Sequence, residues 1–257
     1  MVRLIILLRR PQTIMKIFLR LKEVKLLILS FYILIGNFCD ISASPTQKQD
    51  LSHVIEKIRQ NSKNAILKFK GIDYKRELTI TETDSKTGNQ ISVSKVSTRR
   101  VEYYYERPVI VVLSYSKNGE TLPPKDYEPE RTSPTYPIFD DQSEDHYSIQ
   151  IKGPILFKNR ESYVVDVTPR QLSPRHFKGK IYYDKNSLQP YYIEGTTSKW
   201  KFGVKDMYFK INMELTPDKV AIVRSGDVFV KTHIPLLSPE KDIRIRLETI
   251  EAVPIRK

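Results

Sequence analysis

The most constraining feature of this 257-residue chain is an alternation of apolar and polar side chains with a period of two, which recurs along most of its length. Residues 209–216 read FKINMELT, and residues 243–248 read IRIRLE. Successive side chains of a β-strand point to opposite faces, so each run is typical of a strand with one buried and one solvated face. Such strands form antiparallel sheets that are covered on one side.

Similar short runs follow one another from Lys75 to the end of the chain. The predicted strands are 77–82, 101–105, 109–115, 147–157, 162–168, 178–183, 189–195, 209–215, 228–234 and 243–247. Asn118-Gly119 follows the third of them, and Asn-Gly is typical of a tight hairpin. Alternating strand–helix–strand units are not apparent, which argues against a doubly wound fold. We therefore predict a mainly β protein (α+β) built on a strongly curved antiparallel sheet or a partly closed barrel.

One helix is predicted before the first strand, over Asp50–Lys70, and it is expected to pack on the concave face of the sheet. Apolar residues recur at helical spacing at Leu51, Val54, Ile55 and Ile58. Asp50 is a suitable N-cap. Asn61 and Lys63 weaken the pattern, so the helix is predicted to end near them or to continue to Lys70.

The N-terminal segment has the composition of an export signal. Residues 26–35 read LLILSFYILI and follow several basic residues, and a membrane-spanning helix needs a longer run of roughly 20 apolar residues. Small residues at 42–44 predict cleavage after Ala43, which leaves 44–257 as a single domain. Met15 is a better start than Met1, because it shortens the signal to 29 residues (43 − 14). A lipid anchor on Cys39 is the alternative to a free protein.

Removal of residues 1–43 changes the cysteine content and the net charge of the chain. Cys39 is the single cysteine, so disulfides and Cys-based zinc sites are excluded from the mature chain, and the bacterial periplasm is the expected location. The signal holds seven of the 43 basic and two of the 30 acidic residues, which leaves 36 and 28, a net charge of +8. Most basic residues are interleaved with acids, so we expect a solvated surface and no nucleic-acid partner. Short basic clusters at 99–100 and 199–201 stand apart from this pattern.

No pattern in the sequence indicates catalysis, a cofactor or a metal site. The four histidines, at 53, 146, 176 and 233, lack metal-ligand spacing. The acidic group within 140–145 lacks the spacing of a calcium loop, and the sequence has no nucleophile elbow or phosphate-binding glycine loop. We therefore predict that the protein is not an enzyme. A hydrolase assembled from carboxylates on distant strands remains the alternative.

Residues 120–141 interrupt the alternation. This segment contains five prolines, and proline cannot donate a hydrogen bond to a sheet. We predict a long loop or flap, which is either a disordered insertion or a functional lid.

Residues 162–195, SYVVDVTPRQLSPRHFKGKIYYDKNSLQPYYIEG, resemble the periplasmic outer-membrane lipoprotein-sorting proteins of the LolA/LolB-like superfamily. A valine-rich strand ends at Pro169, and a second strand, a turn containing Asp184 and a third strand with Pro190 at its start follow. The resemblance implies an unclosed antiparallel β-barrel with one or a few helices over its mouth. It also implies an apolar interior that receives the acyl chains of a lipoprotein or lipid.

This resemblance leads to a functional hypothesis. The protein is expected to be a monomeric, non-enzymatic carrier or binder of lipoprotein acyl chains or lipids, with inner- or outer-membrane sorting components as further partners. The candidate ligand-binding residues are Val165, Val167, Ile181, Tyr183, Phe209, Ile211, Met213, Leu215, Ile243, Ile245 and Leu247. The main alternative is an envelope regulatory or structural protein that uses the same fold to bind a protein partner.

Overall fold

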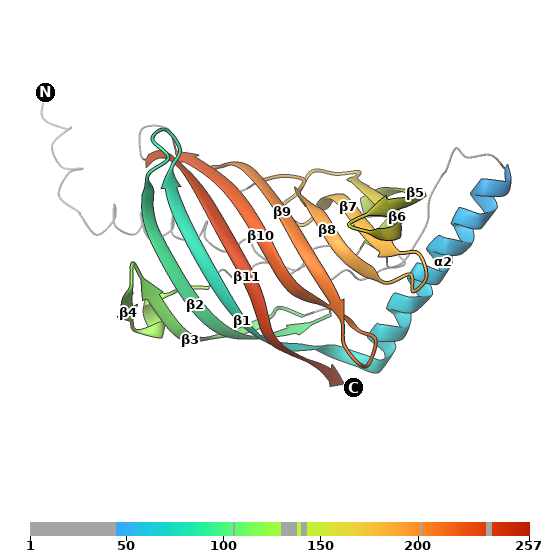
Figure 1. Cartoon of the computed structure of the whole chain (residues 1–257), viewed down its shortest axis with the longest axis horizontal. Coiled ribbons are helices and arrows are strands. Elements are labelled where there is room, and N and C mark those ends of the chain that lie inside the picture. The colour runs from blue at the N-terminus through green and yellow to red at the C-terminus, as the bar shows by residue number, and fades with distance from the viewer. Residues whose placement is uncertain (1–44, 105, 130–137, 140–142, 201, 235–237) are drawn as a thin grey trace, which may run out of the picture.

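A long helix followed by one antiparallel sheet makes up most of the fold (Figure 1). The computed structural model describes residues 45–104, 106–129, 138–139, 143–200, 202–234 and 238–257. The predicted export signal, with Ala43 and Cys39, lies outside these residues. The helices are α2 (Pro45–Lys68), the 3₁₀ turn η3 (Pro124–Asp126) and α3 (Ser143–His146). The strands are β1 (Phe69–Asp84), β2 (Gln90–Tyr103), β3 (Val109–Lys117), β4 (Glu120–Leu122), β5 (Tyr147–Phe157), β6 (Arg160–Pro169), β7 (Phe177–Asp184), β8 (Pro190–Thr197), β9 (Val204–Leu215), β10 (Ala221–Ile234) and β11 (Ser238–Arg256).

The sheet has 11 strands and is not closed. Its order is β4-β3-β2-β1-β11-β10-β9-β8-β7-β6-β5, so strands that follow one another in the chain are neighbours within each half of the sheet. The two halves are joined where β11 pairs with β1. The edge strands β4 and β5 do not pair with each other in the described part of the chain. The predicted mainly β fold with an unclosed barrel is therefore confirmed.

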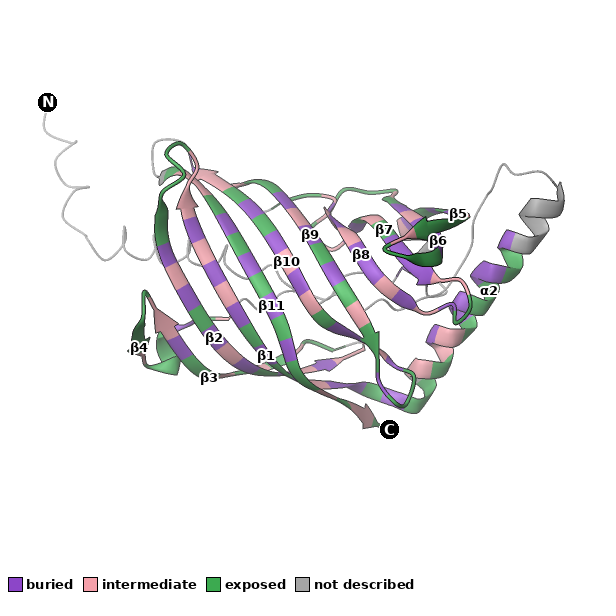
Figure 2. Ribbon diagram, viewed as in Figure 1, coloured by how far each residue is buried: buried purple, intermediate pink, exposed green. Residues whose placement is uncertain are grey.

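The strand register places the apolar residues of distant segments in continuous rows. Ile211 lies opposite Ile193 on one side and Gly226 on the other, and Gly226 lies opposite Leu247. Directly opposed residues on antiparallel strands point to the same face. Ile211 and Leu247 therefore share the concave face, as the period-two alternation predicts, and Figure 2 shows the resulting stripes of buried and exposed residues along the strands.

The helix differs from the predicted one at both ends. It begins at Pro45, so Asp50 lies inside the helix and is not its N-cap. It continues past Asn61 and Lys63 to Lys68 and leads directly into β1. The side chain of Asn61 helps to explain why the helix continues past this residue. Its amide nitrogen donates to the carbonyl oxygen of Leu188 at 3.3 Å, in the turn between β7 and β8.

The strands also extend beyond the predicted segments. β1 begins at Phe69, and β2 begins at Gln90, where the sequence indicated a strand only from residue 101. The Asn118-Gly119 hairpin is confirmed, since it joins β3 to β4 and both residues have positive φ angles, 52° and 86°.

Candidate ligand-binding face

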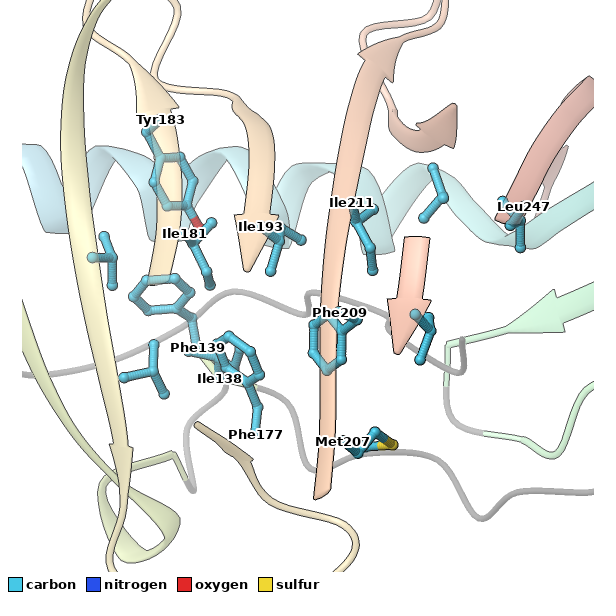
Figure 3. Packing of buried hydrophobic residues seen from close by; sticks show 14 of the residues in the cluster. Ile138, Phe139, Phe177, Ile181, Tyr183, Ile193, Met207, Phe209, Ile211 and Leu247 are labelled. Carbon is cyan, nitrogen blue, oxygen red and sulfur yellow. The ribbon is translucent and has the colours of Figure 1, made fainter. Parts of the chain in front are cut away.

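The concave face of the sheet brings most of the predicted site residues together. Nine of the eleven are buried members of the main apolar cluster, and Phe209, Ile211 and Leu247 are among those seen in Figure 3. Met213 is partly buried and packs against the cluster. Leu215, the last residue of β9, is 39% exposed and lies outside it.

Two glycines allow an aromatic ring to lie flat on this face. Gly179 and Gly195 are opposite each other on β7 and β8. A Cβ atom on Gly195 would lie 2.5 Å from the Phe177 ring, so a larger residue would displace that ring. Phe177 in turn packs against Phe209, with 5.9 Å between ring centroids. The glycines therefore make room for an aromatic pair on the concave surface.

The helix α2 covers part of the concave face. Its buried side chains recur at helical spacing and belong to the same apolar cluster as the strands: Leu51, Val54, Ile55 and Ile58. Figure 3 shows the helix crossing the row of strand side chains. The predicted position of the helix, on the concave side, is confirmed.

A second part of the cover comes from the proline-rich segment. Ile138 and Phe139 are 1% exposed and belong to the main cluster. The Phe139 ring meets the Tyr183 ring edge-on, with 6.3 Å between centroids (Figure 3). Earlier in the segment, Tyr127 packs on Tyr115 of β3, with 5.3 Å between their ring centroids. The segment thus begins as a hairpin and a 3₁₀ turn and later places two apolar side chains in the core.

Tyr183 carries a polar group into this apolar surrounding. Its side chain is completely buried, and its hydroxyl makes no hydrogen bond within the described residues. Burial raises the pKa of Tyr183 well above its usual value, so the hydroxyl stays protonated and can donate. A buried donor of this kind costs stability unless it finds an acceptor.

At one end of the concave face, charged residues replace apolar ones. Arg76 of β1 lies 2.9 Å from a carboxylate oxygen of Glu102, and Arg100 lies 2.6 Å from the same oxygen. The three side chains are 2–5% exposed. The Arg76 guanidinium also lies 3.6 Å from the centroid of the Tyr74 ring. No pattern in the sequence predicts this cluster, although the even-numbered positions of β2 point inward throughout.

The structure also pairs two histidines that are 30 residues apart in the sequence. His176 Nε2 and His146 Nδ1 are 3.2 Å apart, and His176 Nδ1 lies 2.6 Å from Ser173 Oγ. Burial, with His146 and Arg175 nearby, lowers the pKa of His176. Spacing in the sequence gave no sign of this pair. Even so, no group of three or more His, Cys, Asp or Glu residues in the described part of the chain could hold a metal ion.

Several of the strand tyrosines line the convex face and not the concave one. Tyr182 and Tyr192 form a small separate cluster with Val164. Phe157, from the end of β5, stacks on Tyr182 with 3.9 Å between ring centroids. The Lys158 ammonium lies 3.6 Å from the centroid of the Tyr192 ring. Of the aromatic pairs in the sequence, Tyr182-Tyr183 therefore contributes one ring to each face.

The charges on the convex face alternate in sign across the strands. One row of directly opposed residues reads Asp166, Lys180, Glu194, Lys210, Asp227 and Arg246. Opposite charges on neighbouring strands attract each other and break up any continuous basic stripe. A groove on this face is lined mainly by polar residues, among them Ser148, Gln150 and Lys178. None of the described helices is long and apolar enough to span a membrane.

Comparisons with known proteins give distant structural similarities. No family model and no curated protein matches the sequence. The structure is similar to a domain described as an outer-membrane lipoprotein-sorting protein domain from Vibrio parahaemolyticus, with 9% identity, coverage of 79% of this chain and 91% of that one, and a TM-score of 0.45. It is similar to a LolA superfamily protein from Nitrosomonas europaea, with 10% identity, coverage of 80% and 93%, and a TM-score of 0.40.

A third similarity is to the MucA/MucB complex of Pseudomonas aeruginosa, with 10% identity, coverage of 80% and 99%, and a TM-score of 0.25. Similarities this distant assign no function to the chain.

Proposed function

We propose that this protein is a non-enzymatic periplasmic carrier that binds the acyl chains of lipoproteins or lipids on the concave face of its sheet. The observation that carries the proposal is the way this apolar face is covered. Within the described residues, the face is covered by α2 and by Ile138 and Phe139 of the proline-rich segment, and no second sheet packs on it. Such a cover can move aside without breaking the pairing of any strand.

The free energies involved allow an acyl chain to take the place of the cover. Exposing Ile138 and Phe139 to water costs about 1.5–3 kcal/mol for each side chain. Taking an acyl chain out of water returns about 0.8 kcal/mol for each methylene. The two apolar side chains are therefore offset by roughly 4 to 8 methylenes. The acyl chains of membrane lipids are longer than this, so the apolar contribution to their binding exceeds the cost of exposing these two side chains.

The Tyr183 hydroxyl gives the face a place for the polar end of the ligand. It is a buried donor with no acceptor in the described residues, and it lies beside the Phe139 ring that has to move. An ester or carboxylate at the head of an acyl chain would supply the missing acceptor. The ligand that fits is thus a long apolar chain with one oxygen acceptor.

Gentle purification of the protein from the periplasm of its own cells tests the proposal. Native mass spectrometry of the wild-type protein should detect a bound acylated species. The Ile211→Asp variant should lack it, because a charged side chain on the concave face opposes apolar binding. Leu215→Asp is the matched control, since Leu215 lies on the same strand but outside the cluster. Ligand-free wild-type protein would contradict the proposal.

The second candidate function is a module that binds a protein partner. It is favoured by the outward face of β3, where Val109, Val111 and Leu113 are each about half exposed. β4 pairs only with the end of β3, from Tyr115 to Lys117, so the rest of this strand has a free edge within the described residues. A partner strand can add to such an edge. Two results together would favour this function. The wild-type protein would bind no acyl chain, and the Val111→Lys variant would no longer capture the protein partner that the wild type captures.

A further inference from the structure

Two loops at one end of the strands are held together by hydrogen bonds. The first, residues 170–176, joins β6 to β7, and the second, residues 198–203, joins β8 to β9. The Ser173 backbone nitrogen donates to Ser198 Oγ at 2.9 Å, and this hydroxyl donates to the Ser173 carbonyl at 3.0 Å. The Ser198 nitrogen donates to the His176 carbonyl at 2.8 Å. We call the described residues of these two segments the loop pair.

The loop pair exposes large apolar side chains. Leu172 is 71% exposed, Trp200 is 38% exposed and Phe202 is 84% exposed. The Trp200 indole nitrogen donates to Thr196 Oγ1 at 3.1 Å, which holds the ring at the end of β8. Exposed apolar side chains that gather at one place on a surface mark a site of interaction.

The charge of the loop pair has one sign. Arg170 and Arg175 belong to the first loop and Lys199 to the second, and neither segment contains an Asp or Glu in its sequence. The turns at the opposite end of the strands differ, because Asp184 ends β7 at the β7–β8 turn and Asp218 lies in the β9–β10 turn. This basic character also contrasts with the alternating charges of the convex face.

We propose that the loop pair docks on the surface of an anionic phospholipid bilayer. Tryptophan and phenylalanine favour the boundary between headgroups and acyl chains, and lysine and arginine are attracted to anionic headgroups. The combination of exposed aromatic rings with basic side chains fits the boundary of an anionic bilayer, where apolar and negatively charged groups meet. This docking goes beyond the proposed acyl binding and stands without it.

The tryptophan provides the test, because Trp200 is the single tryptophan of the chain. Its fluorescence therefore reports on the loop pair and not on the apolar N-terminal segment. Vesicles of phosphatidylglycerol should shift its emission to shorter wavelength, and brominated acyl chains in those vesicles should quench it. Vesicles of phosphatidylcholine should have a much smaller effect, and added salt should weaken the response to phosphatidylglycerol.

Variants distinguish docking by the loop pair from nonspecific adsorption of exposed apolar side chains to vesicles. Phe202→Ser should weaken partition onto phosphatidylglycerol vesicles about tenfold or more, and Lys199→Gln about fivefold. Leu156→Ser is the control, since Leu156 is 74% exposed in the β5–β6 hairpin at the other end of these strands, and it should leave the partition unchanged.

Three results would overturn the proposal: a Trp200 emission that anionic vesicles do not change, an equal response to phosphatidylcholine, or Phe202→Ser behaving as Leu156→Ser does. Acyl binding is measured without vesicles, so failure of one proposal does not decide the other.

Discussion

The ring of Phe139 meets the ring of Tyr183 edge-on, with 6.3 Å between their centroids, and both side chains are closed off from solvent. Phe139 comes from the proline-rich segment, whereas Tyr183 belongs to β7 in the sheet. The contact therefore joins the cover to the face that it covers. A ligand that takes the place of Phe139 would lie directly beside the Tyr183 hydroxyl, and this arrangement leads to the first prediction.

Tyr183→Phe should separate stability from binding. Removing a buried hydroxyl that has no acceptor in the described residues should raise the free energy of unfolding by about 1 kcal/mol. The same change should weaken binding of a fatty-acid probe roughly 2- to 10-fold, because one hydrogen bond to the ligand is lost. Tyr182→Phe is the control, since its hydroxyl bonds to Glu194 on the convex face. Denaturant titration and probe titration measure the two effects, and an unchanged probe affinity in Tyr183→Phe would count against the assigned role.

The charged cluster at the end of the concave face should be essential for folding. Glu102→Gln leaves Arg76 and Arg100 buried beside each other without the carboxylate that both contact, so unfolding should become easier by about 3–5 kcal/mol. Asp73→Asn is a matched control on the same two strands, because Asp73 pairs with the exposed Arg99 on the other face. Urea titration should show a far smaller loss for this control. Equal losses of the free energy of unfolding in the two variants would contradict the stabilising role predicted for the buried charged cluster.

Stability should decrease as the solution is acidified through the range in which histidine titrates. The pKa of His176 is lowered in the folded protein, so the unfolded chain binds a proton more readily below about pH 6.5. Among the described residues, His146, Arg175, Tyr147 and Ser173 lie beside its ring, and none of these four is an acid that would favour the protonated form. The free energy of unfolding should therefore fall between pH 7 and pH 5.

His176→Gln should make this pH dependence shallower. His53→Gln, at an exposed position of α2, is the control variant. Urea titrations at several pH values measure the slopes. A slope that both variants share with the wild type would show that the His146–His176 contact does not titrate in this range.

The exported protein should begin near Ser44 or Pro45. This follows from the basic segment, the apolar run 26–35 and the small residues before the predicted cleavage after Ala43. N-terminal sequencing of protein taken from the periplasm measures it directly. A mature chain that retains 26–35, or that carries a lipid on Cys39, would instead indicate a membrane-anchored protein.

The sequence predicts well those strands that have one apolar and one polar face. Along residues 209–214 of β9 and 243–248 of β11 the inward positions are apolar and the outward ones polar, so the period of two identifies both strand and face. The part of β2 from Gln90 to Thr98 does not follow this rule, because Ser92, Ser94 and Thr98 point inward. A polar residue on both faces leaves no alternation to detect, although the strand pairs normally with β1.

For the candidate ligand-binding face, too, the sequence predicts only part of what the structure contains. The alternation places Phe209 and Ile211 on the binding face, but contacts between distant segments decide what covers that face. Neither the burial of Phe139 within the proline-rich segment nor the His146–His176 contact depends on local spacing. Such contacts follow from the path of the chain, which one sequence does not reveal.

The measurement that tests the central claim most directly is equilibrium titration with a fluorescent fatty-acid probe. The wild-type protein should bind it saturably. Phe139→Ala should bind it more tightly, because less apolar surface has to be displaced, and Ile211→Ala should bind it more weakly, because the face loses contacts. Circular dichroism of each variant establishes that it is folded. A folded, monomeric wild-type protein that binds no probe would contradict the account.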